Sequence, residues 1–375
     1  MKPAVAVYRG CAYYVTCANL ILRGEIMKYG GLYWNIKQYL PYQRCFNLIN
    51  SERSIGKTYT TQGFFLERAL EHGEEFVYIV RTQDEKEKGV FGKAFEKVCI
   101  NEYQGKNIQF TKEECVLKIE DEDGNTIDSD VLGHCIALSE ATKSKKLNFP
   151  NVRWIMFDEY ILDDKESRGY VTGWNEPDLL LKIYHTIDRE RDYVICFLLA
   201  NNITFYNPYH MHKAFNIPHT EKDKIWFNEN VLFHWVSASL ELKQKKSKCK
   251  FLKMIEGTDY GDYSKEGIYI GDNVNFIGDR TPNSRFVFTL SYKGDNFGVW
   301  QDNKIGLIFI DEKCDPSCPL KYALTLSDHT ENTLLTKNRN NSLLMWLSTN
   351  FKRGNVRYSN MRLKVKCEEA IKLIL

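Results

Sequence analysis

Residues 51–58 read SERSIGKT and end in the triplet GKT (56–58), which is how a nucleotide-binding phosphate loop ends. The loop pattern G-x-x-x-x-G-K-S/T has glycine at its first position, where this chain has Ser51. The preceding CFNLI (45–49) is typical of a buried strand, and the following residues 59–73 of an amphipathic helix. In this strand–loop–helix setting, backbone N–H groups bind phosphate oxygens. Taken alone, the segment fits either a substituted phosphate loop or a surface turn.

The loop residues have distinct expected roles if the loop binds a nucleotide. Lys57 places its ammonium on the β- and γ-phosphates, and the Thr58 hydroxyl is a ligand for Mg²⁺. Arg53 is a further cation that can reach a phosphate, while serine at position 51 costs backbone flexibility rather than chemistry. We therefore expect ATP and Mg²⁺ as cofactors. The expected nucleotide-binding residues of the loop are Ser51, Arg53, Ser54, Ile55, Gly56, Lys57 and Thr58.

A second motif, WIMFDE, occupies residues 154–159. Its apolar run predicts a buried strand that ends in two carboxylates, the first of them 101 residues after Lys57. In a Walker B motif Asp158 organises Mg²⁺ and Glu159 polarises the attacking water. Carboxylates at a strand end can also cap a turn, but the combination with a phosphate loop favours the catalytic interpretation. A glutamate directly after the aspartate is typical of P-loop ATPases that couple hydrolysis to work on polymers.

A third apolar run, VICFLLAN (194–201), predicts another buried strand and ends in Asn201. Such ATPases place at this point a residue that senses the γ-phosphate or the lytic water. An asparagine also suits an ordinary strand-to-loop turn, so both interpretations stay open. Asn201 completes the expected nucleotide-binding set.

Three basic residues near these strands are candidates for action between subunits. Arg189 and Arg191 lie in DRERD (188–192), and in a ring-shaped ATPase an arginine at this place can enter the neighbour's site. The alternative for both is a solvated, salt-bridged helix end. Lys145, in TKSKK (142–146), is a candidate for contact across a subunit boundary or with DNA, and an exposed charge run is its alternative.

The composition suits a globular protein of two domains. The chain has 375 residues, 43% hydrophobic and 27% charged, with a net charge of +2, so a polyanion would have to bind a local basic patch. No run of 18 apolar residues occurs, and we expect no contact with a membrane. Eleven scattered cysteines indicate free thiols in a reducing cytoplasm.

Apolar runs alternate with helix-compatible stretches up to Trp235, which predicts an α/β domain with a mainly parallel sheet and helices on both faces. Beyond it, VNFIG, RFVFTLSYKG, FGVWQDN and KIGLIFID predict an antiparallel meander, and helices are expected over 341–351 and 364–375. Met27 is an alternative start of the chain. The predicted division is an N-terminal extension at 1–32, an ATPase domain at 33–236, a connector at 237–272 and a small α+β domain at 273–375.

Two lysine-rich places are candidates for contact with DNA phosphates. The loop after FVYIV carries Lys86 and Lys88, and the run KQKKSKCK (243–250) carries Lys245 and Lys246. Contacts to phosphates rather than to bases are expected of a motor, which must hold every base step equally. Solvated surface lysines are the alternative at both places.

The segments SERSIGKT, FPNVRWIMFDEY, DRERDYVICFLLANN, NPYH and MIEGTDYGDY together resemble one family. It is the DNA-packaging ATPase of small podophages, a compact counterpart of the large terminase subunit. The resemblance extends from about Tyr33 to the C-terminus. The two Walker motifs are generic, whereas IEGTDYG, PNVRWIMFDEY and the order of the segments are more specific.

The resemblance implies an ATPase domain of the additional-strand, catalytic-glutamate (ASCE) type. It implies a homopentameric ring that docks transiently, in the host cytoplasm, on the portal protein of a procapsid and moves double-stranded DNA. Some relatives also use a scaffold RNA. By position, Asp158 and Glu159 match the family's metal-organising aspartate and catalytic glutamate, and Arg53 matches an arginine in its loop, G-x-R-G-x-G-K-S. The family's trans-acting arginine and intersubunit lysine correspond to Arg189 or Arg191 and to Lys145, while Ser51 and Ser54 replace two glycines.

The C-terminal domain resembles a ribonuclease-H-like nuclease that has lost its chemistry. A two-metal nuclease needs converging carboxylates, one of them on the first core strand, and FVFTLSY (286–292) carries none. Asp295, Asp302 and Asp311 are scattered. We therefore expect an ATP-driven motor that translocates double-stranded DNA into a procapsid. The alternatives are a terminase-like ATPase whose C-terminal endonuclease is still active and a nucleotide-binding scaffold protein without motor action.

Overall fold

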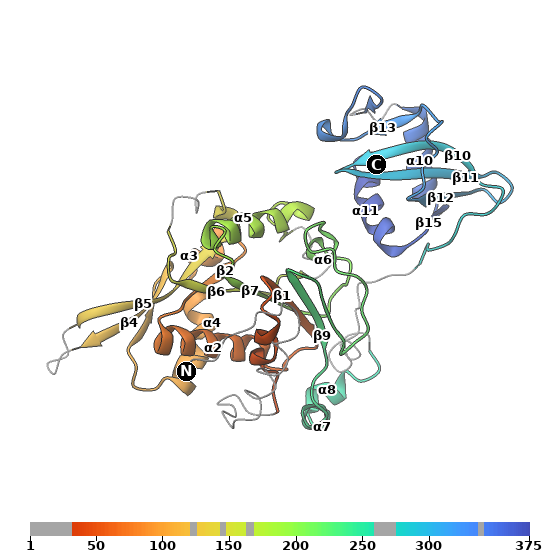
Figure 1. Ribbon diagram of the computed structural model, residues 1–375. Coiled ribbons are helices and arrows are strands. Elements are labelled where there is room, and N and C mark those ends of the chain that lie inside the picture. The colour runs from red at the N-terminus through yellow and green to blue at the C-terminus, as the bar shows by residue number, and fades with distance from the viewer. Residues whose placement is uncertain (1–31, 121–125, 143–147, 163–168, 259–274, 337–340) are drawn as a thin grey trace, which may run out of the picture. The chain divides into compact units, whose positions relative to one another are not determined.

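The computed structural model describes residues 32–120, 126–142, 148–162, 169–258, 275–336 and 341–375. The chain divides into two compact units, Met1–Gly271 and Asp272–Leu375, each built on its own sheet (Figure 1). Among the described residues, no helix is both long enough and apolar enough to cross a membrane.

The strands described in the first unit form one sheet in the order β3-β4-β5-β2-β6-β7-β1-β9-β8. From β5 to β9 in this order, neighbouring strands run parallel, as the continuous apolar runs predict. Every residue of β1 is buried, because helices cover both faces of the sheet. The bounds are β1 Phe46–Ser51, β2 Glu75–Val80, β3 Ile108–Phe110, β4 Glu114–Glu120, β5 Thr126–Ala137, β6 Val152–Asp158, β7 Ile195–Asn201, β8 Ile225–Phe227 and β9 Val231–Val236.

The position of β7 defines the class of the sheet. It lies between β1, which leads into the SERSIGKT loop, and β6, which ends in Asp158. The parallel register pairs Ser51 with Asn201 and Asp158 with Leu199. The carboxyl ends of the three strands therefore meet at one edge of the sheet, where ligands of open α/β sheets bind.

Two apolar cores pack against the two faces of this sheet. One includes Phe65 of α2 and Phe95 of α4, and the other includes Leu180 of α5 and Tyr209 of α6. In Figure 1, α2 and α4 lie on one side of the strands and α5 on the other. The helices of this unit are α2 Lys57–His72, α3 Gln83–Glu87, α4 Val90–Glu102, α5 Glu176–Asp188, α6 Pro208–Met211, α7 Leu240–Ser247 and α8 Lys250–Met254, with 3-10 turns at Ile36–Tyr42, Leu138–Glu140 and Gly173–Asn175.

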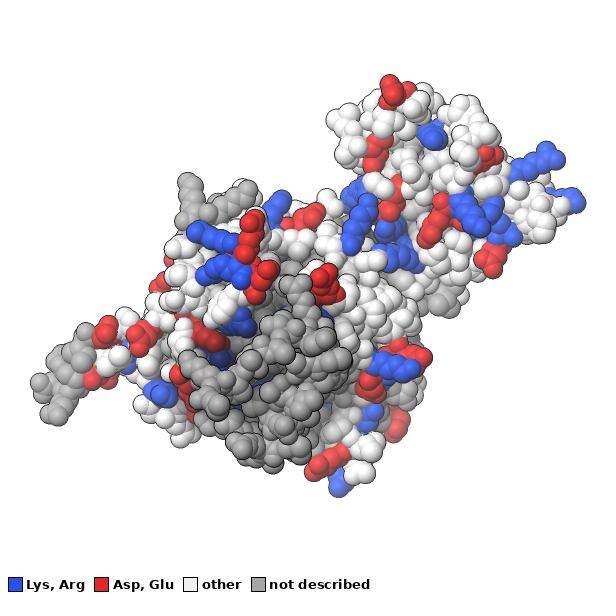
Figure 2. Space-filling model, in the orientation of Figure 1, with Lys and Arg blue, Asp and Glu red and all other residues white. Residues whose placement is uncertain are grey.

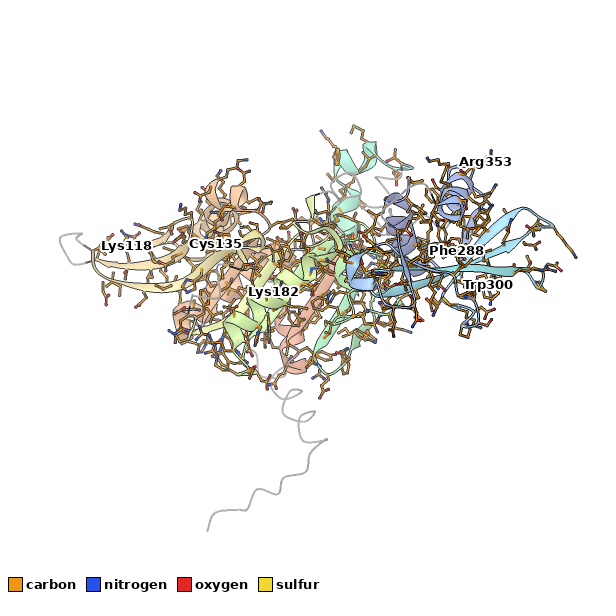
Figure 3. The ribbon with its side chains drawn as sticks, turned by 90° about the horizontal axis from the view of Figure 1, so that it is seen from above. Lys118, Cys135, Lys182, Phe288, Trp300 and Arg353 are labelled. Carbon is orange, nitrogen blue, oxygen red and sulfur yellow. The ribbon has the colours of Figure 1, made fainter. Side chains whose placement is uncertain are left out.

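An antiparallel extension that the sequence reading missed continues the sheet through β4 and β3. Cys135 of β5 is buried where that strand joins the parallel sheet, while Lys118 of β4 lies farther along the hairpin (Figure 3). Most residues of β4 are at least partly exposed. β5 begins at Thr126, and only its residues from Gly133 to Ala137 pair with β2 in the parallel sheet.

The second unit contains a sheet in the order β14-β13-β10-β11-β12-β15. The antiparallel meander β10-β11-β12 is confirmed, and β13 and β14 continue parallel to β10. This pattern of three antiparallel strands followed by two parallel ones is that of a ribonuclease-H-like sheet. In Figure 3, Phe288 lies on β10 and Trp300 on β11. The bounds are β10 Arg285–Tyr292, β11 Asp295–Asp302, β12 Leu307–Asp311, β13 Lys321–Ala323, β14 Leu334–Leu335, β15 Val356–Tyr358, α10 Ser342–Lys352 and α11 Met361–Lys372, with a 3-10 turn at Leu326–Asp328.

One expectation about the second half of the chain is corrected. The described part of VNFIG, residues 275–278, is no strand of the meander, since Ile277 forms only an isolated bridge with Tyr358. The segment read as a connector begins with two helices, α7 and α8. Ser239 caps the first of them by accepting from the N–H of Leu242, a local signal of the kind that begins helices.

Candidate functional site

A pocket of about 360 Å³ opens at the carboxyl edge of β1, β6 and β7. The SERSIGKT loop forms one wall, and the ends of the other two strands form the opposite one. The expected phosphate loop, Walker B carboxylates and sensor asparagine therefore come together, although the sequence separates them by up to 150 residues. The lining residues are Arg53, Ser54, Ile55, Gly56, Lys57, Thr58, Tyr59, Asp158, Glu159, Ala200 and Asn201.

The backbone conformation of the loop shows at which positions another residue can replace a glycine of the family's loop pattern. Ser51 is the last residue of β1, so its backbone is that of a strand, where serine is an ordinary residue. Gly56 has a φ of 94°, and a Cβ there would lie 3.2 Å from the Cβ of Tyr33. Ser54 has a φ of 64°, in the left-handed region that disfavours side chains. The loop thus keeps glycine at one such position and carries a strained serine at the other.

Lys57 extends from the start of α2 to the edge of the sheet. Its ammonium donates hydrogen bonds to the Ser51 hydroxyl and to Oδ1 of Asn201, the second over 3.5 Å. Burial lowers the pKa of Lys57 to about 8, and the charge of Asp158 partly offsets this effect. The ammonium of Lys57 is thus partly removed from water at the ends of the strands. A phosphate group in the pocket would give it a negatively charged partner.

Thr58 and Asp158 form the oxygen pair that a magnesium ion requires. The Thr58 hydroxyl donates a hydrogen bond of 2.6 Å to Oδ2 of Asp158. Burial raises the pKa of Asp158 above its usual value, while this hydrogen bond and the charge of Lys57 act in the opposite direction. Hydroxyl and carboxylate oxygens are the hard ligands that Mg²⁺ prefers, so the residues present fit this ion.

Glu159 follows directly in a strained turn, with a φ of 54° and an exposed side chain. Its N–H donates to Oδ1 of Asp158 over 3.0 Å. Its carbonyl accepts from Nη2 of Arg81 at 3.2 Å, and the next carbonyl, that of Tyr160, accepts from the same atom at 3.1 Å. The buried Glu176 holds this arginine at 3.2 Å through Nε. Arg81 thus fixes the main chain that carries the candidate catalytic carboxylate.

A hydrogen bond of Tyr160 also connects this turn to β1, the strand before the phosphate loop. The Tyr160 hydroxyl donates to Oδ1 of Asn50 on β1 and lies 2.7 Å from Nε2 of His210. Burial lowers the pKa of His210 to about 3, so this imidazole is neutral at physiological pH. The roles of Arg81, Tyr160 and His210 in this arrangement were not predicted from the sequence. The signal available in the sequence was polar residues at or beside the ends of buried apolar strands, namely Asn50 in β1 and Arg81 after β2.

The two candidate trans-acting arginines are not among the residues that line the pocket of their own chain. Arg191 donates hydrogen bonds to the carbonyls of Phe149, Pro150, Ile187 and Asp188 over 2.8–3.1 Å. Arg189 is the exposed C-cap of α5. Lys145 lies outside the described residues. Arg191 is therefore bound to its own chain by four carbonyls, whereas Arg189 is exposed and donates a long hydrogen bond of 3.4 Å from Nε to the carbonyl of Thr186.

Of the four lysines expected to contact DNA, two form ion pairs inside the fold and two lie at the surface. Lys86 is buried and its ammonium lies 3.1 Å from Glu140, and Lys246 lies 3.0 Å from the buried Glu52. Neither is a solvated surface lysine, the alternative to contact with DNA, because each ammonium pairs with a carboxylate inside the fold. Lys88 pairs with Asp84 on the surface and Lys245 is exposed, so both stay candidates for phosphate contact.

Asp295, Asp302 and Asp311 of the second unit each have a separate partner. Asp295 pairs with Lys366 at 2.8 Å, Asp311 pairs with Arg280 at 2.7 Å, and Asp302 accepts from the Thr281 hydroxyl. Within the described parts of the chain, no three acidic, cysteine or histidine residues are grouped so that they could hold a metal ion.

Sheet order and pocket define the class of this protein. An additional strand between the phosphate-loop strand and the Walker B strand, with Glu159 directly after Asp158, makes it a P-loop protein of the ASCE type. The family model of the podovirus DNA encapsidation protein (Gp16) matches residues 28–373, and the chain belongs to this family. The function of this chain, as of its family, is DNA packaging.

Individual relatives agree with this assignment. The chain is 32% identical to the DNA packaging protein of Bacillus phage phi29 over 332 residues, which cover 88% of this chain and 94% of that protein. It is similar to a chain of the bacteriophage phi29 viral genome packaging motor assembly, with a TM-score of 0.71, 31% identity and coverage of 92% of this chain and 100% of that one. A chain of the Phi-28 gp11 DNA packaging motor has the same fold, with a TM-score of 0.61, 19% identity and coverage of 91% and 98%.

Proposed function

We propose that this chain hydrolyses ATP in the pocket between β1, β6 and β7 and uses the reaction to drive double-stranded DNA into a procapsid. The observation that carries the proposal is the 2.6 Å contact between Thr58 and Asp158, with Lys57 and Glu159 lining the same pocket. A protein that only binds nucleotide has no need for a glutamate held beside the metal-binding aspartate.

Each of these residues has one task in the reaction. Lys57 binds the β- and γ-phosphates through its ammonium, and the loop N–H groups hold the remaining phosphate oxygens. Thr58 and Asp158 would hold Mg²⁺, and this ion would supply positive charge to the phosphate oxygens. Glu159 orients a water for in-line attack and accepts its proton. Asn201 lies within 3.5 Å of the Lys57 ammonium and so responds to the phosphate that Lys57 contacts.

The motor context follows from the family. We propose a homopentameric ring that docks transiently on the portal protein of a procapsid in the host cytoplasm, with a scaffold RNA as an optional partner. Arg189, exposed at the end of α5, is the candidate for entry into the neighbour's pocket. Lys88 and Lys245 are the candidates for DNA phosphate contact. On the face shown in Figure 2 acidic and basic side chains are interspersed, so contact with DNA must rest on local groups of lysines rather than on net charge.

ATPase activity measured with and without DNA and procapsids tests this proposal. Glu159→Gln keeps the shape of the side chain and should leave ATP binding within about twofold, while turnover falls by about 10²–10⁴-fold because the general base is lost. A Glu159→Gln variant that hydrolyses ATP at the wild-type rate removes Glu159 from the mechanism. Incubation with plasmid and Mn²⁺ addresses the endonuclease alternative, which nicking would support.

A further inference from the structure

A fully buried carboxylate inside the phosphate loop binds a helix that lies almost 200 residues further along the chain. Glu52 is 0% exposed, and its Oε2 lies 3.0 Å from the ammonium of Lys246. Its Oε1 accepts the backbone N–H of Ala238 over 2.9 Å. Both partners belong to the segment that leads from the first unit towards the second. The loop that faces the pocket is therefore attached to this segment through one side chain.

Lys246 contacts the loop at a second point as well. Its ammonium donates a hydrogen bond to the backbone carbonyl of Arg53, and its side chain is only 13% exposed. Its charge is close enough to Lys57 to contribute to the lowered pKa of that residue. Two ammonium groups thus lie next to the phosphate loop. That of Lys57 lines the pocket, and that of Lys246 contacts Glu52 and the carbonyl of Arg53.

The helix that carries Lys246, α7, has few other attachments to the rest of the first unit. In α7 the buried residue is Leu242, and most of the remaining side chains are polar and exposed. At its start, the Ser239 hydroxyl donates to the carbonyl of Leu32 over 3.0 Å. The place of α7 against the sheet therefore depends strongly on the ion pair between Lys246 and Glu52.

We propose that Lys246 is a positioning residue of the phosphate loop and that its ion pair with Glu52 transmits nucleotide binding to α7. The inference rests on the proposed function, because it requires nucleotide phosphates in the pocket. Phosphates bring negative charge to the loop, which strengthens its hold on the Lys246 cation and orders the Arg53 carbonyl. A ligand shifts an equilibrium only through contacts that differ between two states, and this ion pair supplies that difference.

Hydrogen exchange of the α7 amides measures this coupling directly in the full chain. With Mg²⁺ and the non-hydrolysable analogue AMP-PNP, exchange within Leu240–Ser247 should become about tenfold slower than without nucleotide. The double variant Glu52→Gln/Lys246→Met removes the pair without leaving a buried charge alone, so it should fold and bind the analogue. Its α7 amides should exchange at the same rate with and without the analogue.

Two further variants separate positioning from simple stability. Lys246→Arg keeps a cation at this place and should restore most of the response. Lys245→Met removes an exposed lysine from the same helix and should respond like the wild type. The inference is overturned if AMP-PNP binds the wild type without slowing exchange in α7, or if the double variant keeps the full response. Failure of the wild type to bind AMP-PNP would overturn the proposed function itself.

Discussion

Nη2 of Arg81 lies 3.2 Å from the carbonyl oxygen of Glu159, so an arginine at the end of β2 holds the main chain of the candidate general base. The same guanidinium pairs with the fully buried Glu176, which also accepts the Tyr209 hydroxyl over 2.7 Å. Because Glu159 has a positive φ, its conformation depends on such external contacts. Arg81 therefore links the buried core to the position of the candidate catalytic carboxylate.

Replacement of this arginine should lower turnover more than substrate affinity. Arg81→Met alone leaves Glu176 buried without its partner, at a cost of about 3–5 kcal/mol in stability. The double variant Arg81→Met/Glu176→Gln should fold, with kcat for ATP reduced by about 10²-fold through displacement of Glu159 and KM within about twofold. Steady-state ATPase assays measure both constants.

The ion pair between Arg68 and Glu74, 2.7 Å long and remote from the pocket lining, is a matched control. Arg68→Met/Glu74→Gln should leave kcat within about twofold, because neither residue touches the site. Equal losses of kcat in the two double variants would contradict a specific role for Arg81.

The serine with a φ of 64° in the loop predicts a stabilising substitution. Ser54→Gly relieves left-handed strain but adds freedom to the unfolded chain, so we expect a net gain of about 0.5 kcal/mol. Gly56→Ala should destabilise the fold, because its φ is 94° and the new Cβ would crowd Tyr33. Urea unfolding measures both changes. A loss of stability in Ser54→Gly would show that the serine side chain contributes more than its backbone strain costs.

The lowered pKa of Lys57 makes ATP binding dependent on pH. In the free protein this pKa is about 8, so the ammonium loses its proton as the pH rises through that value. Bound phosphates favour the charged form, so the pKa rises in the complex and binding takes up protons near pH 8–9. ATP affinity should therefore fall above pH 8. Calorimetry in buffers of different ionisation enthalpy measures this proton uptake. The uptake should vanish in Lys57→Arg. Proton uptake that persists in this variant would assign the titration to another group.

Arg189 and Arg191 should differ in the effect of their removal. Arg191→Ala deletes a guanidinium that binds four carbonyls, and we expect a loss of about 1–2 kcal/mol in stability. Arg189→Ala should leave the melting temperature unchanged. If Arg189 acts in the neighbouring pocket, its removal lowers ATP turnover of the motor assembled on procapsids by about 10³-fold or more. Full activity of assembled Arg189→Ala would reject the assignment.

Local sequence patterns were sufficient to predict several elements of the site. Continuous apolar runs predicted the parallel strands, since strands buried on both faces cannot alternate polar and apolar residues. Lys57, Thr58 and Asp158 could be assigned because each follows or ends such a run at the spacing that phosphate chemistry requires. Serine at position 51 proved compatible with the loop because that residue still belongs to β1.

Local patterns did not predict which charged residues face the site, the solvent or the interior, because the packing of distant segments sets this. Lys86 and Lys245 lie in similar lysine-rich sequence, yet one is buried against Glu140 and the other is exposed. Arg81 and Lys246 became neighbours of the site through contacts that span 78 and 194 residues. The free energy of a charge depends on its burial and on its partner, and for these residues both are set by the packing of distant segments rather than by neighbours in sequence.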